Sequence, residues 1–264
     1  MTSATDGNVG TNGNLSTNGN PTTINGNLST PRTGTGSCTS NNVTAWTQGT
    51  GHVTGSIIEL PQPVNYPTPT IPADGTVSLV TNSSCPTMTG TGATCNKTSV
   101  MTITPTVANG TVELADLSLT GNKDLHLAAG TYNINTLKET GQTALVLDSV
   151  PVILNVTGTG GGTVLDLTGG SISNTTNNFD PSTFQIVYAG NGSISLKGGA
   201  AAVGLMYAPN ASYSFGGNGD WYGSVIGASL TDMGGAAIHY DRRLKDKYYM
   251  AGPYMLNSFT WNKY

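Results

Sequence analysis

Aspartate is the residue of this chain best suited to acid–base chemistry or to binding a hard cation such as Ca²⁺. Two pairs are spaced so that a repetitive fold could stack them on one face: Asp148 and Asp166 are eighteen positions apart, and Asp220 and Asp241 are twenty-one apart. Stacked carboxylates are the machinery of polysaccharide lyases and hydrolases. Aspartate, however, is also a common turn residue, whose side chain bonds its own backbone, and Asp220 stands beside Gly219. We therefore predict no catalytic residue, no cofactor and no metal ligand, with a bound Ca²⁺ as the alternative.

The segment His239-Tyr240-Asp241 contains residue types found in hydrolase relays. Successive residues of a strand point to opposite faces, so these three side chains cannot line up as a relay. No Gly-x-Ser-x-Gly segment, which would expose a nucleophilic serine, accompanies them. We expect Ile238 and Tyr240 to point inward and His239 to lie on the surface.

The chain contains three cysteines, Cys38, Cys85 and Cys95. Cys85 and Cys95 bracket a short loop rich in Pro, Gly and Thr, which suits a disulfide in an oxidising compartment. A bridge from Cys38 to one of the other two, or three unpaired thiols, are the alternatives. The three histidines are scattered and no Cys-x-x-Cys spacing occurs, which disfavours a metal site.

The last 23 positions hold five of the ten basic residues among several aromatic residues. We interpret residues 242–264 as a cap, because the open end of a repetitive sheet presents unpaired backbone groups. The alternative is a surface that docks an acidic partner or a glycan. Its candidate residues are Trp221, Tyr222, Arg242, Arg243, Lys245 and Lys247. Aromatic residues in a repeat more often fill the core or a cap than bind sugars.

Repeats in the sequence indicate the short strands and corners that would position these residues. The segment from Val187 to Leu196 aligns with the segment from Met206 to Phe215, nineteen positions later, so that Tyr188 matches Tyr207. A third copy begins at Val225. Near the N-terminus, Asn-Gly-Asn recurs every six or seven residues, and both residue types tolerate tight corners. A single coil cannot bury its apolar edge alone, whereas stacked coils form a continuous core.

The sequence therefore predicts an all-β fold: a right-handed parallel β-helix, or solenoid, with an irregular insertion rich in Pro and Thr and a C-terminal cap. We predict one domain over residues 1–264. Its parts are N-terminal Asn-Gly-Asn rungs (1–32), a loop and the Pro/Thr-rich insertion (33–111), the main rungs (112–241) and the cap (242–264). Five prolines within residues 59–75 require an extended, irregular path there.

Several segments follow one another in a familiar order: Gly130-Thr131-Tyr132, 152–158, 207–211, 219–227 and 237–241. Together with the Asn-Gly-Asn segments and the closing residues 255–261, they resemble the β-helical C-terminal domain of bacterial type IV pilus-assembly surface proteins (PilX-like, minor-pilin-like). The resemblance implies a surface location, with adhesion or filament association and no catalytic residues. No secretory signal or hydrophobic helix is visible at Met1, so we expect an export or anchor segment upstream.

Composition narrows the functional classes. Gly, Thr, Asn and Ser make up almost half of the 264 residues, charged residues only 9%, and the formal net charge is −4. This balance disfavours a nucleic-acid binder, and no apolar run is long enough to span a membrane. We expect a non-enzymatic, extracellular structural or adhesive module of a bacterial cell-surface or pilus-associated assembly, with copies of itself, other subunits or glycans as partners. A carbohydrate-active enzyme, a carbohydrate-binding β-helix and, less favoured, an ice-binding β-helix remain alternatives.

Overall fold

The computed structural model describes residues 7–13, 15, 23–31, 52–174, 178–197, 202–217, 219–241 and 243–244. The chain forms two compact units, residues 1–66 and residues 67–264. Each unit is described by itself, and a single domain stays a prediction. Cys38, Arg242, Lys245 and Lys247 lie outside the described residues, as does the predicted cap beyond residue 244.

The first unit contains five short strands in two parallel sheets: β1 (Val9–Gly10), β3 (Leu28–Thr30) and β5 (Ile57–Glu59) in one, β2 (Thr23–Ile24) and β4 (His52–Val53) in the other. Asparagine side chains bond from one coil to the next at the corners. The Asn27 amide N–H donates to Asn8 Oδ1 at 2.8 Å, and the Ser56 N–H donates to Asn27 Oδ1 at 2.9 Å. Val9 pairs with Leu28, nineteen residues on, and Leu28 pairs with Ile57, twenty-nine residues on, so a whole coil is longer than the Asn-Gly-Asn recurrence of six or seven residues.

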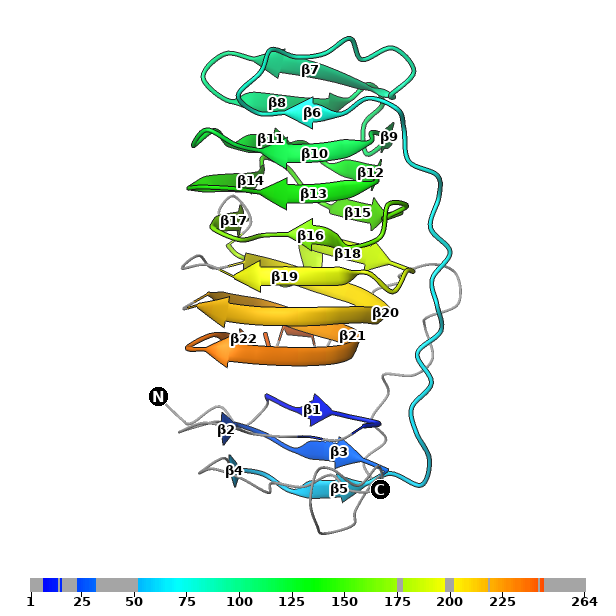
Figure 1. Ribbon diagram of the computed structural model, residues 1–264, viewed down its shortest axis with the longest axis vertical. Helices are drawn as coiled ribbons and strands as arrows, with labels where there is room; N and C mark the ends of the chain where they lie inside the picture. Colours follow the sequence, from blue (N-terminus) through cyan, green and yellow to red (C-terminus); the bar gives the residue numbers. More distant parts are fainter. Residues whose placement is uncertain are drawn as a thin grey trace. The chain divides into compact units, whose positions relative to one another are not determined.

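The second unit is one strongly curled, mostly parallel sheet of seventeen strands, which confirms the predicted all-β solenoid-like fold (Figure 1). The described residues of both units contain no α-helix; a 3-10 turn, η2 (Pro181–Thr183), lies between β17 and β18. The strands of the main stack are β10 (Asp116–Leu119), β11 (Leu125–Leu127), β12 (Gly130–Ile134), β13 (Thr136–Glu139), β14 (Thr143–Leu147), β15 (Val152–Val156), β16 (Thr163–Asp166), β17 (Gly170–Ser173), β18 (Phe184–Tyr188), β19 (Ser193–Lys197), β20 (Ala202–Gly217), β21 (Asp220–Gly234) and β22 (Ala237–His239).

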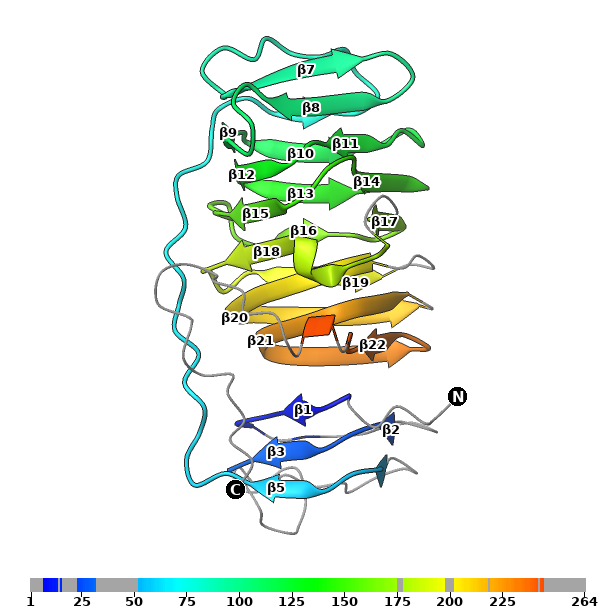
Figure 2. The ribbon, with the colours of Figure 1, turned by 180° about the vertical axis from the view of Figure 1, so that it is seen from behind.

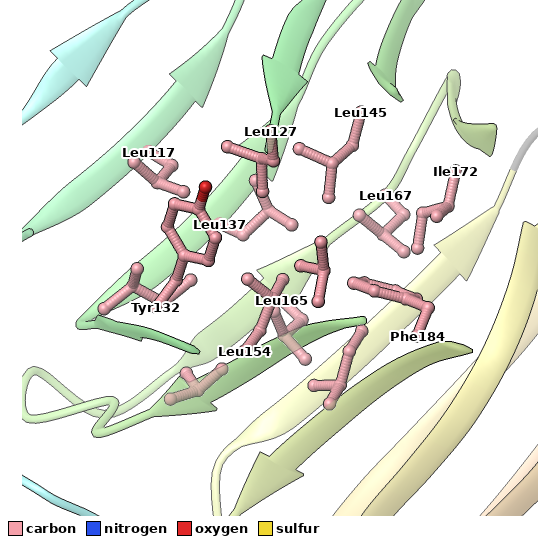
Figure 3. Close-up of a cluster of buried hydrophobic side chains, with 14 of the residues drawn as sticks. Leu117, Leu127, Tyr132, Leu137, Leu145, Leu154, Leu165, Leu167, Ile172 and Phe184 are labelled. Carbon is pink, nitrogen blue, oxygen red and sulfur yellow. The ribbon is translucent and has the colours of Figure 1, made fainter. Parts of the chain in front are cut away.

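Buried and exposed residues alternate along the strands, because every second side chain points into the coil. Pairing in register then places like side chains above one another, as in the column Leu117, Leu137, Leu165, Ile194 and Tyr213. All five are at most 2% exposed. Figure 3 shows how leucine, isoleucine and aromatic side chains from successive coils fill the interior. Each buried apolar side chain of this size contributes about 1.5–3 kcal/mol.

The predicted match of Tyr188 with Tyr207 is wrong by one position. Val187 pairs with Tyr207, twenty residues apart, whereas the nineteen-residue spacing holds between β19 and β20. Between β20 and β21 it holds up to Ala208 and becomes seventeen after a bulge, where Ser212 pairs with Ser229. A shift of one residue turns a side chain to the other face of a sheet. Tyr188 therefore packs in the core, while Tyr207 lies on the outer face and donates its hydroxyl to the Pro67 carbonyl at 2.6 Å.

Residues 76–111, which we expected to be an irregular insertion, contribute strands to the stack. These are β6 (Leu79–Val80), β7 (Ala93–Lys97), β8 (Met101–Pro105) and β9 (Thr111–Glu113). β7 and β8 form an antiparallel hairpin, and β8 continues in parallel register onto β11. Thr dominates this segment, but Met101 and Ile103 supply fully buried side chains above Leu125 and Leu127, and these buried side chains make it part of the core.

Residues 67–78, which we call the strap, run extended along the stack, consistent with the predicted path of its prolines (Figures 1 and 2). At one end the strap is held by Tyr207, and the Asn210 side-chain amide donates to Thr68 Oγ1 at 3.0 Å. At the other end the Gly75 N–H donates to the Leu114 carbonyl at 3.0 Å. The strap thus connects the late strand β20 with the beginning of the stack.

Candidate functional site

The disulfide predicted between Cys85 and Cys95 is present, with Cα atoms 5.7 Å apart. It joins the loop before β7 to β7 itself, so it fastens the hairpin that begins the stack. Both cysteines are partly buried and pack against the core. A disulfide is typical of proteins that fold in an oxidising compartment.

The first aspartate pair is not brought together. Asp148 follows β14, and its Oδ1 lies 2.6 Å from His126 Nδ1. Asp166 lies in β16, on a different side of the coil, and accepts a hydrogen bond from the Thr168 N–H, two residues on. The bond between Thr168 and Asp166 is the side-chain-to-backbone bond of a turn, which the sequence indicates for these aspartates.

The second pair forms two separate contacts. Asp220 Oδ1 lies 3.5 Å from His239 Nε2, and the rings of His239 and Tyr222 stack with centroids 4.6 Å apart. Asp241 instead pairs with Arg243, whose Nε donates to Asp241 Oδ2 at 2.9 Å. The hydrogen bonds from Arg243 lower the pKa of the Asp241 carboxyl below its ordinary value.

Arg243 also clamps a corner of the chain. Its Nη1 donates to the Asn178 carbonyl at 3.2 Å and its Nη2 to the Phe179 carbonyl at 2.8 Å. Asn178 and Phe179 both have positive φ, which is unusual for a residue as bulky as Phe. Of the four basic residues predicted to form a binding surface, Arg243 is the one that the structure describes, and here it holds backbone in place.

Trp221 and Tyr222 lie on opposite faces of β21. Trp221 is only 1% exposed and packs in the core, whereas Tyr222 is 37% exposed. Ile238 and Tyr240, which we expected to point inward, are 41% and 39% exposed. Ile238 belongs to β22, the last strand of the described sheet, and Tyr240 follows it. β22 pairs with the first three residues of β21. Ile238 nevertheless pairs in register with the buried Trp221, so it lies on the inward face as expected, and His239, which pairs with the exposed Tyr222, faces outward as expected. For Tyr240, which follows β22, the inward expectation was wrong.

A small hollow opens at the corner next to Trp221. Its volume is about 20 Å³, which is room for about one water molecule. Its lining consists of Leu167, Gly170, Ser171, Leu196, Lys197, Ala202, Phe215, Gly219, Asp220 and Trp221. The indole N–H of Trp221 is buried and has no hydrogen-bond partner in the described part of the chain. Buried Trp N–H groups usually have a partner. The hollow is the candidate site among the described residues, although the buried indole nitrogen is not accessible from it.

Metal ligation and membrane insertion find no support in the described ranges. Within them, no group of three or more His, Cys, Asp or Glu side chains is arranged to hold a metal ion. Over the same ranges no helix has the length and apolarity needed to cross a membrane.

The model of a domain of unknown function, DUF7305, matches residues 74–247, well over half of the chain. The chain belongs to the DUF7305 family. No curated protein and no solved structure matches it. The matched range covers the hairpin, the disulfide and the whole parallel stack, so these features form the DUF7305 domain of this chain.

The DUF7305 domain also contains a buried carboxyl group that the sequence analysis missed. Glu139, at the end of β13, is fully buried, and neither carboxyl oxygen has a hydrogen-bond partner among the described residues. Burial raises the pKa of Glu139 well above its ordinary value, and the charges of Asp124 and Asp166 raise it further. One sequence signal was available: Glu139 occupies an inward position of the repeat, in register with Leu119.

Proposed function

We propose that this protein is a non-enzymatic structural or adhesive module of a bacterial cell-surface assembly, and specifically of a pilus-associated one. The observation that carries the proposal is a stack of parallel coils that begins with a disulfide-fastened hairpin. Coil-to-coil backbone hydrogen bonds and an apolar interior suit a part that must keep its form outside the cell. The disulfide supports an oxidising, extracellular setting.

The surface chemistry supports assembly more than catalysis. The outward positions of the stack are occupied largely by Thr, Ser and Asn, and the chain carries few charges. Outward side chains bond from coil to coil, as in the bond from the Asn155 amide to Asn133 Oδ1 at 2.9 Å. Such ladders stiffen the outer face. The partners that we propose are other subunits or further copies of this chain.

The pilus association extends the resemblance noted in the sequence, and it is the more specific half of the proposal. Surface display is tested by expressing the natural gene product in its own cells with an epitope inserted after Gly160, in an exposed corner. Immunogold labelling of intact cells is expected, and sheared filaments should carry the label. Labelling that appears only after the cells are permeabilised would refute surface display; labelled cells with unlabelled filaments would refute the pilus association alone.

A further inference from the structure

The last described strands, β21 and β22, lie at the end of the second unit away from the β7–β8 hairpin (Figure 1). The later part of β21 pairs with β20 along one edge, and no described strand pairs with its other edge. Residues 227–231 lie on this free edge, and all five are exposed. An unpaired edge presents backbone N–H and C=O groups that can pair with a further strand.

Two inward columns of side chains reach this end without a cover. Leu230 pairs in register with the buried Tyr213, so it continues the column that includes Leu117, yet it is 48% exposed. Ile238 continues the column of the buried Trp221 and is also exposed. An inward apolar side chain of a stack is normally covered by the next coil. Residues 227–231 and Ile238 together form what we call the open end of the stack.

The hairpin end of the stack is built differently. β7 runs antiparallel to β8, and the disulfide from Cys95 to Cys85 holds the preceding loop against β7. Lys97, also in β7, donates to the Ser83 carbonyl in the same loop. Charged side chains and covering loops are common protections of an edge strand against pairing with another chain. At the open end, by contrast, residues 222–231 carry no charge and residues 227–231 stay exposed.

We infer that the open end binds a second copy of this chain, with residues 227–231 of the two copies paired as antiparallel strands around a twofold axis. Identical strands related by a twofold axis pair in the antiparallel sense, and the same surface serves both copies. With the axis at Leu230, the two Leu230 side chains cover each other, and Ser229 of each copy faces Thr231 of the other. This inference deepens the proposed function, on which it rests, by naming the partner and the contact.

The residues of the free edge favour a second copy over two other partners. A twofold axis brings like residues together, and like charges facing across strands repel, but residues 222–231 have none. Ser and Thr hydroxyls pair well across strands, and Leu against Leu removes apolar surface from water. A charged partner strand would find no opposite charge on this edge. The hairpin end of another copy is closed by its loop, so association stops at two copies.

The test is sedimentation velocity of the full chain over a range of concentrations, in which we expect a dimer that dissociates on dilution. Leu230→Lys and Leu230→Glu should each weaken the dimer about 100-fold, because each places two like charges face to face. An equimolar mixture of the two variants should restore the dimer, since the introduced Lys then faces the introduced Glu. Val107→Lys, the same change at an exposed apolar residue between β8 and β9, should leave the dimer unchanged.

A second measurement avoids charged substitutions, in case these variants fail to fold. Facing positions of paired strands lie within the span of a disulfide. Leu230→Cys, in a chain that also carries Cys38→Ser, should therefore form a disulfide between two copies on oxidation. Val107→Cys in the same background should not.

Three results would overturn the inference. The first is a monomer at every concentration, which would mean that the open end stays in water or is covered by another part of the same chain. The second is a dimer that survives Leu230→Lys, and the third is a mixture of folded Leu230→Lys and Leu230→Glu that stays monomeric. Surface labelling of cells with a monomeric chain would remove this inference alone. A dimer without surface labelling would remove the proposed function alone.

Discussion

Replacing Glu139 by Gln should change how the stability of the stack depends on pH. Glu139 is fully buried at the end of β13, and its carboxyl oxygens have no partner among the described residues. Burial and the negative charges of Asp124 and Asp166 raise its pKa well above 4.5, so the folded chain holds a proton that the unfolded chain releases. Among the described residues no positive charge offsets this effect. Lys138, next to Glu139, is exposed on the outward face and pairs in register with Asp166.

The sign follows from the difference in bound protons. Below the unfolded pKa of about 4.5, both states are protonated and Glu139 adds no pH dependence. As the pH rises from there toward the raised folded pKa, the unfolded state binds fewer protons, so the free energy of unfolding falls. The slope contributed by Glu139 is about 1.4 kcal/mol per pH unit within that window. Glutamine keeps the shape of the side chain and cannot ionise, so Glu139→Gln should remove this slope.

The assay is urea unfolding, followed by circular dichroism, of both proteins at unit steps of pH from 4.5 upward. The difference in unfolding free energy between Glu139→Gln and the unmodified chain should grow with each step, in favour of the variant. Glu113→Gln removes a carboxyl from an exposed position of β9 and controls for the loss of one charge. Parallel pH profiles for the unmodified chain and Glu139→Gln would refute the reasoning, because they would show that Glu139 ionises equally in both states.

Three further outcomes are expected. Cys95→Ser removes a disulfide that closes a loop of about ten residues and should lower the free energy of unfolding by about 2.7 kcal/mol. Urea unfolding measures this loss, with Cys38→Ser, which keeps the disulfide, as the control; an unchanged midpoint for Cys95→Ser would contradict the prediction. Gly170→Ala places a Cβ 2.6 Å from the Glu139 Cβ and should lower the free energy of unfolding by about 1–3 kcal/mol in the same assay. Gly160→Ala, which adds a Cβ in open space, should change it little. Tyr207→Phe removes the bond to Pro67 and should cost about 1 kcal/mol and speed proteolysis within the strap; equal cleavage rates would show that Tyr207 does not hold it.

The alternation of apolar and polar residues was enough to predict the class of fold. Leu117, Leu137 and Leu165 each occupy an inward position of a short strand, and their stacking follows from the need to bury them. The bridge between Cys85 and Cys95 was also predictable, because a short loop keeps their ends close. These features depend on local spacing, which a sequence displays directly.

Features that depend on the exact offset between coils were not predictable. One residue more or less at a corner decides whether Tyr207 faces the core or the strap, and identical residue types at Tyr188 and Tyr207 concealed that shift. The hollow is assembled from separate coils, so its lining has no signature in any one segment. Glu139 appeared as an ordinary polar residue, although its alternation with Leu137 places it on the inward face of β13. The depth of its burial depends on the coils on either side, which its neighbours along the chain do not show.

The strap determines where mechanical tension enters the second unit. Tension applied through residue 66 reaches the Tyr207 and Asn210 contacts before it reaches the first coil, since the strap is bonded to β20 and to the segment before β10. The bonds of Tyr207 and Asn210 to the strap must therefore break before tension passes along the strap to the bond between Gly75 and Leu114. The coils are thereby protected from being peeled away one at a time from the hairpin end.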